Sequence, residues 1–136
     1  MSLLAAVVFG LALQTPSPII TIARDTMSQV DSPRQLVART QAEWAALWRD
    51  HAGATAPPAV DLATRTVVAV FLGSRSTGGY AVEITGTRQQ GPALVVQWRE
   101  RRPAPDQVSA QVITSPAHIV SIPQFAGEIR FERVDK

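Results

Sequence analysis

The chain has 136 residues, of which 46% are hydrophobic and 18% are charged, and this composition excludes both a disordered chain and a polyelectrolyte. Its 13 basic and 11 acidic residues are interspersed and give a net charge of +2, so they form no large patch of one sign. The chain has no cysteine and only two histidines, which excludes disulfide frameworks, thiolate metal sites, cysteine nucleophiles and multi-histidine metal centres. We therefore expect one domain without a cofactor or a bound metal.

The chain begins with an apolar run, LLAAVVFGLAL, from residue 3 to residue 13. As a helix it would be about 17 Å long, too short for a hydrocarbon core of about 30 Å but suited to a signal peptide. A polar, proline-bearing stretch follows, so we predict a leader over residues 1–17 and an exported bacterial domain, periplasmic or extracellular, over residues 18–136. No basic residue precedes the run and its best cleavage pattern, Gly10-x-Ala12, is weak, so an upstream start and a buried first strand or helix stay open. Because the sequence has no cysteine, we expect no lipid attachment site and no stable membrane anchor in the mature chain.

One helix is predicted, and it begins after Thr40. Thr40 and Glu43 form a capping box, in which each side chain bonds a backbone N–H at the start of the helix. A stripe on one helix face then contains Trp44, Leu47, Trp48 and His51. Gly53 ends the helix. We expect the apolar members of the stripe to be buried against a sheet, with His51 at the margin.

The remainder of the chain has the pattern of short strands separated by turns. Two short apolar stretches come early, at residues 19–23 and 35–39, and residues 66–72 (TVVAVFL) are apolar throughout, as expected of a central strand covered on both faces. Later segments alternate in polarity or are apolar and short: residues 80–85, 94–99, 108–112, 119–122 and 129–131, with a hairpin loop at 86–92. Six or seven strands and one helix predict a mostly β fold, an antiparallel β sandwich or open barrel, with the helix packed on the sheet.

An unusual glycine-rich segment, from Gly73 to Tyr80 (GSRSTGGY), joins two of these strands. Its first six residues have the G-x4-G spacing of a phosphate-binding loop. However, Gly79 and Tyr80 stand where lysine and serine or threonine are required, and a strand follows instead of a helix. The segment also lacks the G-x-S-x-G spacing of a nucleophile elbow. The sequence therefore gives no basis for a nucleotide site or a serine-hydrolase elbow here.

Two interpretations of this segment stay open. In the first it is a turn that serves the fold only. In the second it is a protein-binding loop whose backbone N–H groups and arginine bind a carboxylate or the backbone of a partner, and its residues are Gly73, Arg75, Ser76, Thr77, Gly78, Gly79 and Tyr80. In both, the last three residues should shape the loop through glycine conformations that a side chain would penalise and through a buried tyrosine ring. The arginine, serine and threonine should lie at the tip and contribute little to folding.

No catalytic set is evident. His51 adjoins Asp50 and His118 lies near Ser115, but no third group or oxyanion loop accompanies either pair, and neighbours in sequence need not be neighbours in a site. We expect His51 to be a member of the helix stripe and His118 to be partly exposed. The carboxylates are scattered over outward positions or loops: Glu83, Glu100, Asp106 and Glu128. The sequence therefore predicts a protein that is not an enzyme.

The densest basic cluster is WRERR, residues 98–102. Nucleic-acid binding would need such residues repeated over a face with aromatic side chains between them, which is not the case here. We interpret the cluster as a solvated strand end, and a rim for an acidic protein partner stays open. The expected partner is a protein, not a nucleic acid.

Residues 67–84 resemble the signature of the PrcB C-terminal family, in which an apolar strand leads into G-x-R-x-T-G-G-Y and an alternating strand. The pattern E-W-x-x-L-W-x-x-H at residues 43–51, with P-P-x-x-D at 57–61, and Q-V-I-T-S-P at 111–116 are similar to that family as well, so the resemblance covers about residues 34–134. The family is named for an accessory lipoprotein that stabilises a bacterial cell-surface subtilisin-like protease complex. The resemblance implies an exported domain that associates with a protease, although this chain lacks the lipid-attachment cysteine.

An alternative resemblance is to chagasin-like cysteine-protease inhibitors, whose inhibitory loop carries T-T-G-Y before a strand. Thr77-Gly78-Gly79-Tyr80 is similar in chemistry and placement. The inhibitors' other motifs have no clear match, because Arg102-Pro103 is followed by Ala104 where an aromatic residue is needed. An enzyme with an unrecognised site is a third hypothesis, which predicts turnover that depends on His51 or His118.

Overall fold

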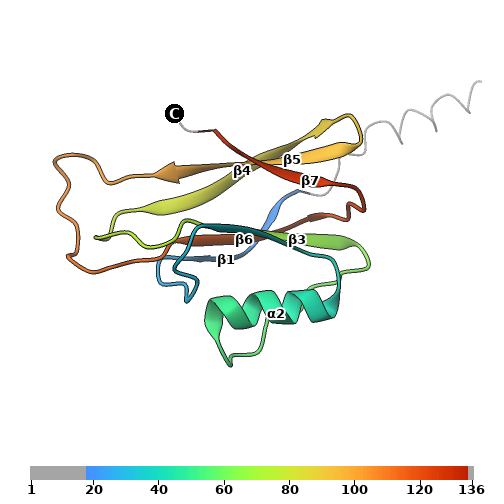
Figure 1. Cartoon of the computed structure of the whole chain (residues 1–136), viewed down its shortest axis with the longest axis horizontal. Helices are drawn as coiled ribbons and strands as arrows, with labels where there is room; N and C mark the ends of the chain where they lie inside the picture. The colour runs from blue at the N-terminus through green and yellow to red at the C-terminus, as the bar shows by residue number, and fades with distance from the viewer. Residues whose placement is uncertain (1–17, 135–136) are drawn as a thin grey trace, which may run out of the picture.

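Seven strands and one helix make up residues 18–134, the part of the chain that the computed structural model describes (Figure 1). In chain order they are β1 (Ile20–Asp25), β2 (Arg34–Ala38), α2 (Gln41–Ala52), β3 (Arg65–Phe71), β4 (Ala81–Gln90), β5 (Ala93–Arg101), β6 (Ala117–Pro123) and β7 (Ile129–Arg133). The leader predicted over residues 1–17 lies outside the described residues. Within residues 18–134, no helix is long and apolar enough to cross a membrane.

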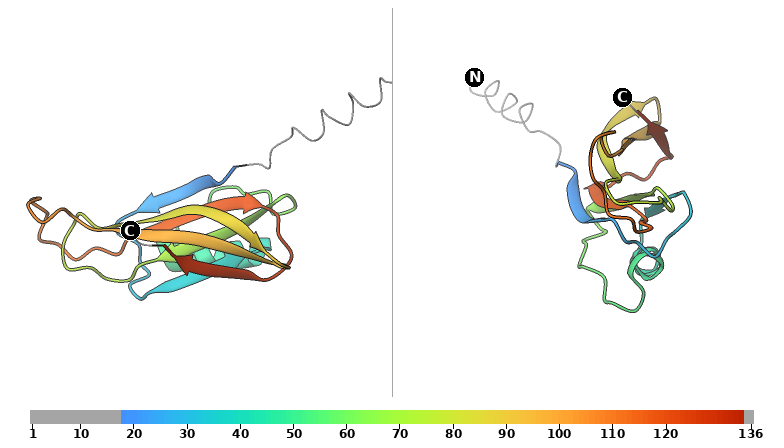
Figure 2. Two further views of the ribbon diagram at one scale, coloured as in Figure 1. Left: turned by 90° about the horizontal axis from the view of Figure 1, so that it is seen from above. Right: turned by 90° about the vertical axis from the view of Figure 1, so that its left-hand side faces the viewer.

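The strands form two separate sheets that face each other (Figures 1 and 2). The first has the order β1-β6-β3-β2 with every pair antiparallel, and the second has the order β4-β5-β7. The mostly β sandwich with one helix is therefore confirmed, and the open barrel is not adopted. One pair departs from the antiparallel prediction: β7 runs parallel to β5, because the chain crosses from β6 in the first sheet to reach the edge of the second.

The inner strand β3 has both faces covered, as its continuous apolar sequence predicted. Val67, Ala69 and Phe71 pack with the helix side of the core. The alternate residues, Val68 and Val70, pack between the two sheets. The molecule thus has three layers, with α2 over one face of the four-stranded sheet and the three-stranded sheet over the other (Figure 2).

Helix α2 begins and ends where the sequence predicts. Its first turn is capped by the Thr40 hydroxyl, which accepts from the Glu43 N–H at 3.1 Å, while the Glu43 carboxylate accepts from the Arg39 N–H at 2.8 Å. Gly53 caps the other end at φ 72°. One detail of the buried stripe was wrong: His51 is buried and Trp48 is only half-buried, because the His51 ring enters the core beside Phe71.

Two strand predictions were wrong. Residues 108–112 alternate in polarity but form no strand, because no neighbouring strand pairs with them and they lie in the connection from β5 to β6. Residues 86–90 were expected to be a loop and instead extend β4, so the hairpin turn is confined to Gly91 and Pro92. A register shift between Ile84 and Gly86 bends β4 before this extension.

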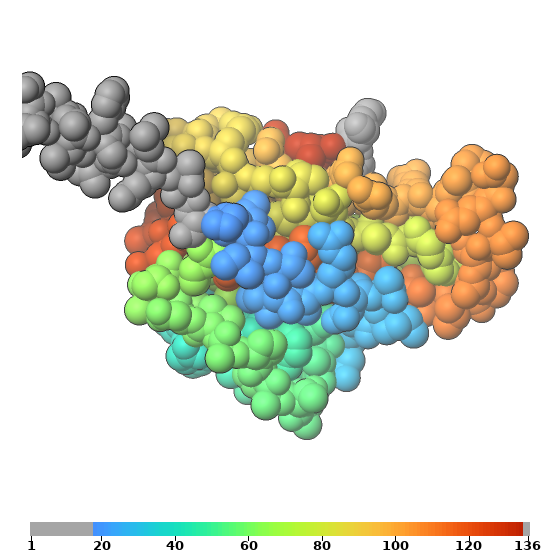
Figure 3. All heavy atoms as spheres, turned by 180° about the vertical axis from the view of Figure 1, so that it is seen from behind, coloured from blue at the N-terminus to red at the C-terminus, as the bar shows by residue number. Residues whose placement is uncertain are grey.

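Three connections gather at one end of the sandwich, and we call this the loop end. They are residues 26–33, 73–80 and 102–116, at the left of Figure 1. Backbone hydrogen bonds join them: Ser74 N–H donates to Asp31 O at 3.1 Å, and Gly78 N–H donates to Ala110 O at 2.9 Å. Residues 102–116 project as a lobe at the right of Figure 3. The predicted binding loop therefore belongs to a larger surface made by three segments.

Candidate functional site

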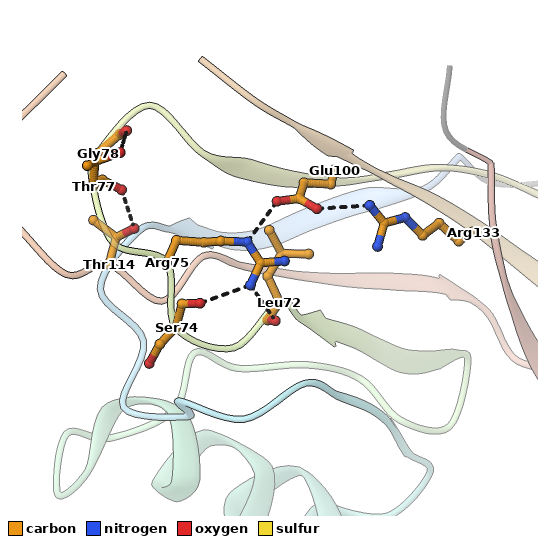
Figure 4. A network of polar contacts seen from close by, with 8 residues as sticks. All are labelled: Leu72, Ser74, Arg75, Thr77, Gly78, Glu100, Thr114 and Arg133. Atoms are coloured by element: carbon orange, nitrogen blue, oxygen red, sulfur yellow. Dashed lines mark hydrogen bonds and ion pairs between the residues drawn. The ribbon is translucent and has the colours of Figure 1, made fainter. Parts of the chain in front are cut away.

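The side chain of Arg75 is turned inward from the loop and does not project from its tip (Figure 4). Its Nε donates to Glu100 Oε2 at 2.8 Å, and its Nη1 donates to the carbonyls of Ser74 at 2.9 Å and Leu72 at 3.3 Å. The guanidinium carbon also lies 5.9 Å from the centre of the Tyr80 ring. The expectation that Arg75 contributes little to folding is therefore corrected, because this arginine ties the loop to β5.

Glu100 is the buried centre of this network. Its side chain is 3% exposed, and its second oxygen, Oε1, accepts from Arg133 Nη2 at 2.9 Å. The hydrogen bond from Arg75 lowers the pKa of Glu100 below its ordinary value, in opposition to burial, which raises it. Arg133 in turn lies against the Trp98 ring, 5.3 Å from its centre. A carboxylate thus joins the loop, β5 and the end of β7.

The backbone of the loop is held by the segment before β6. Arg75 and Thr114 exchange backbone hydrogen bonds of 2.7 and 2.9 Å. The Thr114 hydroxyl also donates to the Thr77 carbonyl at 3.0 Å (Figure 4). Thr77 is therefore half-buried and engaged, while Ser76 is exposed. Of the three residues expected at the tip, only the serine lies free of the network drawn in Figure 4.

The glycines of the loop have different roles. Gly79 has φ 91°, and a side chain there would meet Pro103 Cβ at 2.7 Å. Gly73 has φ 83° and lies against Pro33. Gly78 has no positive φ and room for a methyl group, so the penalty expected there was wrong and belongs to Gly73 instead. Tyr80 precedes β4 and is half-buried, less than its buried neighbours on the strand.

The loop end exposes a set of large apolar side chains that sequence reasoning missed. We call them the apolar tip, and they are Met27, Val108, Val112 and Ile113. Val108 is 95% exposed and Ile113 is 67% exposed. The alternation of Val108, Ala110 and Val112 with polar residues predicted a strand over residues 108–112. The flanking prolines at 103, 105 and 116 were the signal in the sequence that this segment is a connection.

The structure also brings together a serine, a histidine and an aspartate that lie apart in the sequence. His51 Nδ1 lies 2.7 Å from Ser28 Oγ, and His51 Nε2 lies 2.7 Å from Asp25 Oδ2. This set has the composition of a catalytic triad, in which the serine is accessible to substrate and the aspartate is buried. Here the exposures are reversed, because Ser28 is 7% exposed and the Asp25 side chain is 50% exposed. The neighbouring pocket of about 340 Å³ is lined by Asp25 and His51 but not by Ser28. The set is therefore arranged to join β1 to the end of α2.

His118 is buried, at 1% exposure, which corrects the expectation that it is partly exposed. Its Nδ1 accepts from the Ile84 N–H at 2.9 Å, and its Nε2 lies 2.9 Å from Thr21 Oγ1. Burial lowers its pKa to about 4, and the Arg24 guanidinium, 3.3 Å away, acts in the same direction. A neutral ring is thus held between β6, β4 and β1.

The described residues contain no group of three or more acidic, histidine or cysteine side chains that could bind a metal ion. Glu83 accepts from Arg99 at 2.9 Å and from Arg101 at 3.4 Å, and the first of these bonds lowers its pKa. The exposed Glu128 is paired with Arg130. The acidic residues noted in the sequence are therefore not brought to one place.

Comparison with known proteins supports the family resemblance. The model of the PrcB C-terminal family matches residues 66–123, which run from β3 through the glycine-rich loop and β5 to β6. No curated protein and no solved structure matched the chain. The matched range contains Arg75, Glu100 and Thr114, which join the glycine-rich loop to β5 and to the segment before β6. Residues 66–123 match the PrcB C-terminal family and so support the predicted resemblance over this part of the range of about residues 34–134.

Proposed function

We propose that this chain is a non-enzymatic, exported domain that binds and stabilises an exported protease, and that it contacts this partner through the loop end. The observation that carries the proposal is the apolar tip. Four of the five large hydrophobic residues that are exposed among residues 18–134 lie in the connections of the loop end, and exposed apolar surface is typical of an interaction site. The family match supports a partner in a protease complex.

The apolar tip stands on a rigid base. Thr114, next to Ile113, exchanges backbone hydrogen bonds with Arg75, and Ala110, between the two valines, accepts from Gly78. Arg75 is itself fixed by the buried Glu100. A surface that is ordered before binding loses less conformational entropy on association. The signature residues would therefore serve binding by holding the tip in place.

The covered position of Thr77 and Gly78 favours this function over a chagasin-like inhibitor. An inhibitory loop must present its residues to the active site of the protease, whereas here Gly78 and Thr77 bond to residues 110 and 114. The low exposure of Ser28 likewise disfavours a hydrolase. An inhibitor would reduce the activity of papain in a titration, and a serine hydrolase would react with a fluorophosphonate; we expect neither.

The test is capture of the protease from the native host by the tagged chain. Wild type is compared with Val108→Asp/Ile113→Asp in the tip and with Ile20→Asp, which alters an exposed apolar side chain on β1 outside the loop end. We expect one exported protease to be captured by wild type and by the Ile20 control, but not by the tip variant. The captured protease should also lose activity more slowly on heating when wild type is added.

Absence of any protease in the wild-type sample would contradict the proposal. An equal loss of the protease with the Ile20 control would show that the loop end is not the contact surface. The melting temperatures of the three proteins provide the folding control, because all the altered side chains are exposed.

A further inference from the structure

We propose that a cationic pocket beside the apolar tip receives an acidic side chain of the partner protein. This inference rests on the proposed function and names the chemistry of the partner. The pocket has a volume of about 490 Å³ and is lined by Gly79, Ala81, Arg99, Glu100, Arg101, Arg102 and Gln107. Gln107 directly precedes Val108 of the tip, so the same connection borders both surfaces.

The acidic groups near the pocket are already engaged. Glu100 is 3% exposed and bonds inward to Arg75 and Arg133. Glu83 receives Arg99 and Arg101 on a single oxygen, Oε1. Glu83 therefore compensates one of the two charges of Arg99 and Arg101, and neither carboxylate pairs with Arg102.

The arginines of the pocket retain hydrogen-bond donors. Arg101 is 58% exposed, and it contacts Glu83 through Nε at 3.4 Å. The two terminal nitrogens of its guanidinium therefore remain able to donate hydrogen bonds to a ligand. Arg102 is exposed and makes no ion pair with any residue between 18 and 134. Asp106, in the same connection, does not line the pocket. Two guanidinium groups thus border one hollow with an excess of positive charge.

The remaining polar groups also favour an anion. The Gln107 side-chain oxygen accepts from the Ala104 N–H at 3.1 Å, so its NH₂ group is the part left to donate. A guanidinium bonds a carboxylate through two parallel N–H groups, which gives direction as well as charge. The pocket therefore suits a glutamate or aspartate side chain that lies next to apolar residues on the partner.

A protein acid fits this surface better than a polyanion. The arginines occupy one pocket and are not repeated along a face, and the chain as a whole carries a net charge of only +2. Binding of a nucleic acid requires several phosphate contacts along a strand, usually with aromatic side chains for the bases. One carboxylate beside an apolar contact needs neither.

The probe for this pocket is fluorescein-labelled hexaglutamate with capped ends, titrated at low salt and followed by fluorescence anisotropy. Hexaglutamine is the neutral control. The pocket variant is Arg101→Gln/Arg102→Gln, and the control is Arg49→Gln/Arg130→Gln, which removes the same charge from α2 and β7. We expect the pocket variant to bind about tenfold more weakly than wild type and the control to bind like wild type. Arg102→Gln alone, which breaks no ion pair among the described residues, should show part of the loss with an unchanged melting temperature.

Equal affinity of wild type and the pocket variant would overturn the proposal, and so would an equal loss in the charge-matched control. It would also be overturned if phosphatidylserine vesicles or a single-stranded oligonucleotide bound more tightly than hexaglutamate through the same arginines. Capture of the protease separates this inference from the proposed function. If the pocket variant captures the protease as well as wild type does, the inference that the pocket binds the partner is wrong and the proposed function is retained. If hexaglutamate binds through the pocket but no protease is captured, the proposed function is wrong and the pocket is retained as a binding site for acidic side chains.

Discussion

Arg75 and Glu100 contribute to the stability of the loop end because their charges meet out of water. A carboxylate with a 3% exposed side chain is costly to bury unless it is paired, and two arginines pair with this one. Removing one of them leaves part of the negative charge uncompensated in a buried site. The pair therefore couples the geometry of the loop to the stability of the whole sandwich.

We predict that Arg75→Ala lowers the free energy of unfolding by about 2 kcal/mol, less than the full cost of an unpaired buried charge because Arg133 still bonds Glu100. Ser76→Ala, the exposed neighbour, should change it by less than about 0.5 kcal/mol. Urea unfolding of the three proteins measures both values. Equal stability of wild type and Arg75→Ala would mean that the pair is solvated and that Arg75 is the free tip residue expected from sequence.

The local pattern around Arg75 predicts the loop but not the partner of this arginine. The glycines predict a turn, and Gly79 adopts the positive φ that glycine tolerates in turns. Glu100 lies 25 residues away, and its position among arginines in WRERR suggested a solvated strand end. The period of two along β5 places Glu100 on the same face as the buried Trp98, and this is the signal that would have pointed inward.

At the scale of elements, α2 separates the structural features that depend on neighbouring residues in the sequence from those that depend on distant ones. The cap and the apolar stripe are local, so Thr40, Gly53 and the burial of Trp44 were predictable. The extent to which Trp48 and His51 are buried was not predictable. It depends on the contacts of His51 with Ser28 and Asp25, which come from another part of the chain. Likewise, residues 108–112 alternate in polarity but form no strand, because no other strand lies beside them to pair with.

The two tryptophans of the helix differ in their polar contacts, and this gives a matched test. Trp44 Nε1 donates to the Pro58 carbonyl at 2.9 Å, whereas Trp48 Nε1 is buried without a hydrogen-bond partner in the described part of the chain. Trp44 is also more deeply buried than Trp48, so its replacement by phenylalanine removes more buried apolar area as well. We predict that Trp44→Phe destabilises the protein by about 1 kcal/mol more than Trp48→Phe, because only the first leaves a carbonyl without its donor.

Thermal or urea unfolding of the two variants gives this difference directly, and Trp44→Ala, expected to cost about 3–5 kcal/mol, sets the scale for full burial. A larger loss from Trp48→Phe than from Trp44→Phe would contradict the assignment of the helix face.

At the scale of the whole molecule, a neutral histidine ring forms a buried hydrogen bond between the two sheets. His118 lies on β6 of the first sheet, and its Nδ1 accepts from Ile84 N–H, next to the register shift in β4 of the second. Its Nε2–H then points to Thr21 on β1. A proton added to Nδ1 would face the Ile84 N–H and remove this bond. The same ring would also place a positive charge near Arg24.

These contacts make the stability of the sandwich depend on pH in a defined direction. Burial, with help from Arg24, lowers the pKa of His118 from 6.5 to about 4, so the unfolded chain takes up the proton first. The contribution of the neutral ring is complete above pH 6.5 and is lost as the pH falls toward 4. At about 1.4 kcal/mol per pH unit the loss amounts to roughly 3 kcal/mol.

We therefore predict that the free energy of unfolding, measured with urea at pH 7.5, 5.5 and 4.5, declines through this series in the wild type. The lowered pKa values of Glu83 and Glu100 add acid sensitivity mainly near and below pH 4.5, the ordinary value for glutamate, so comparison with a variant that lacks the ring isolates the contribution of His118. His118→Gln removes the titrating group: it should be less stable at pH 7.5 but nearly constant across the series. A decline of the same size in this variant would show that the link between the sheets does not titrate and that another group governs acid unfolding.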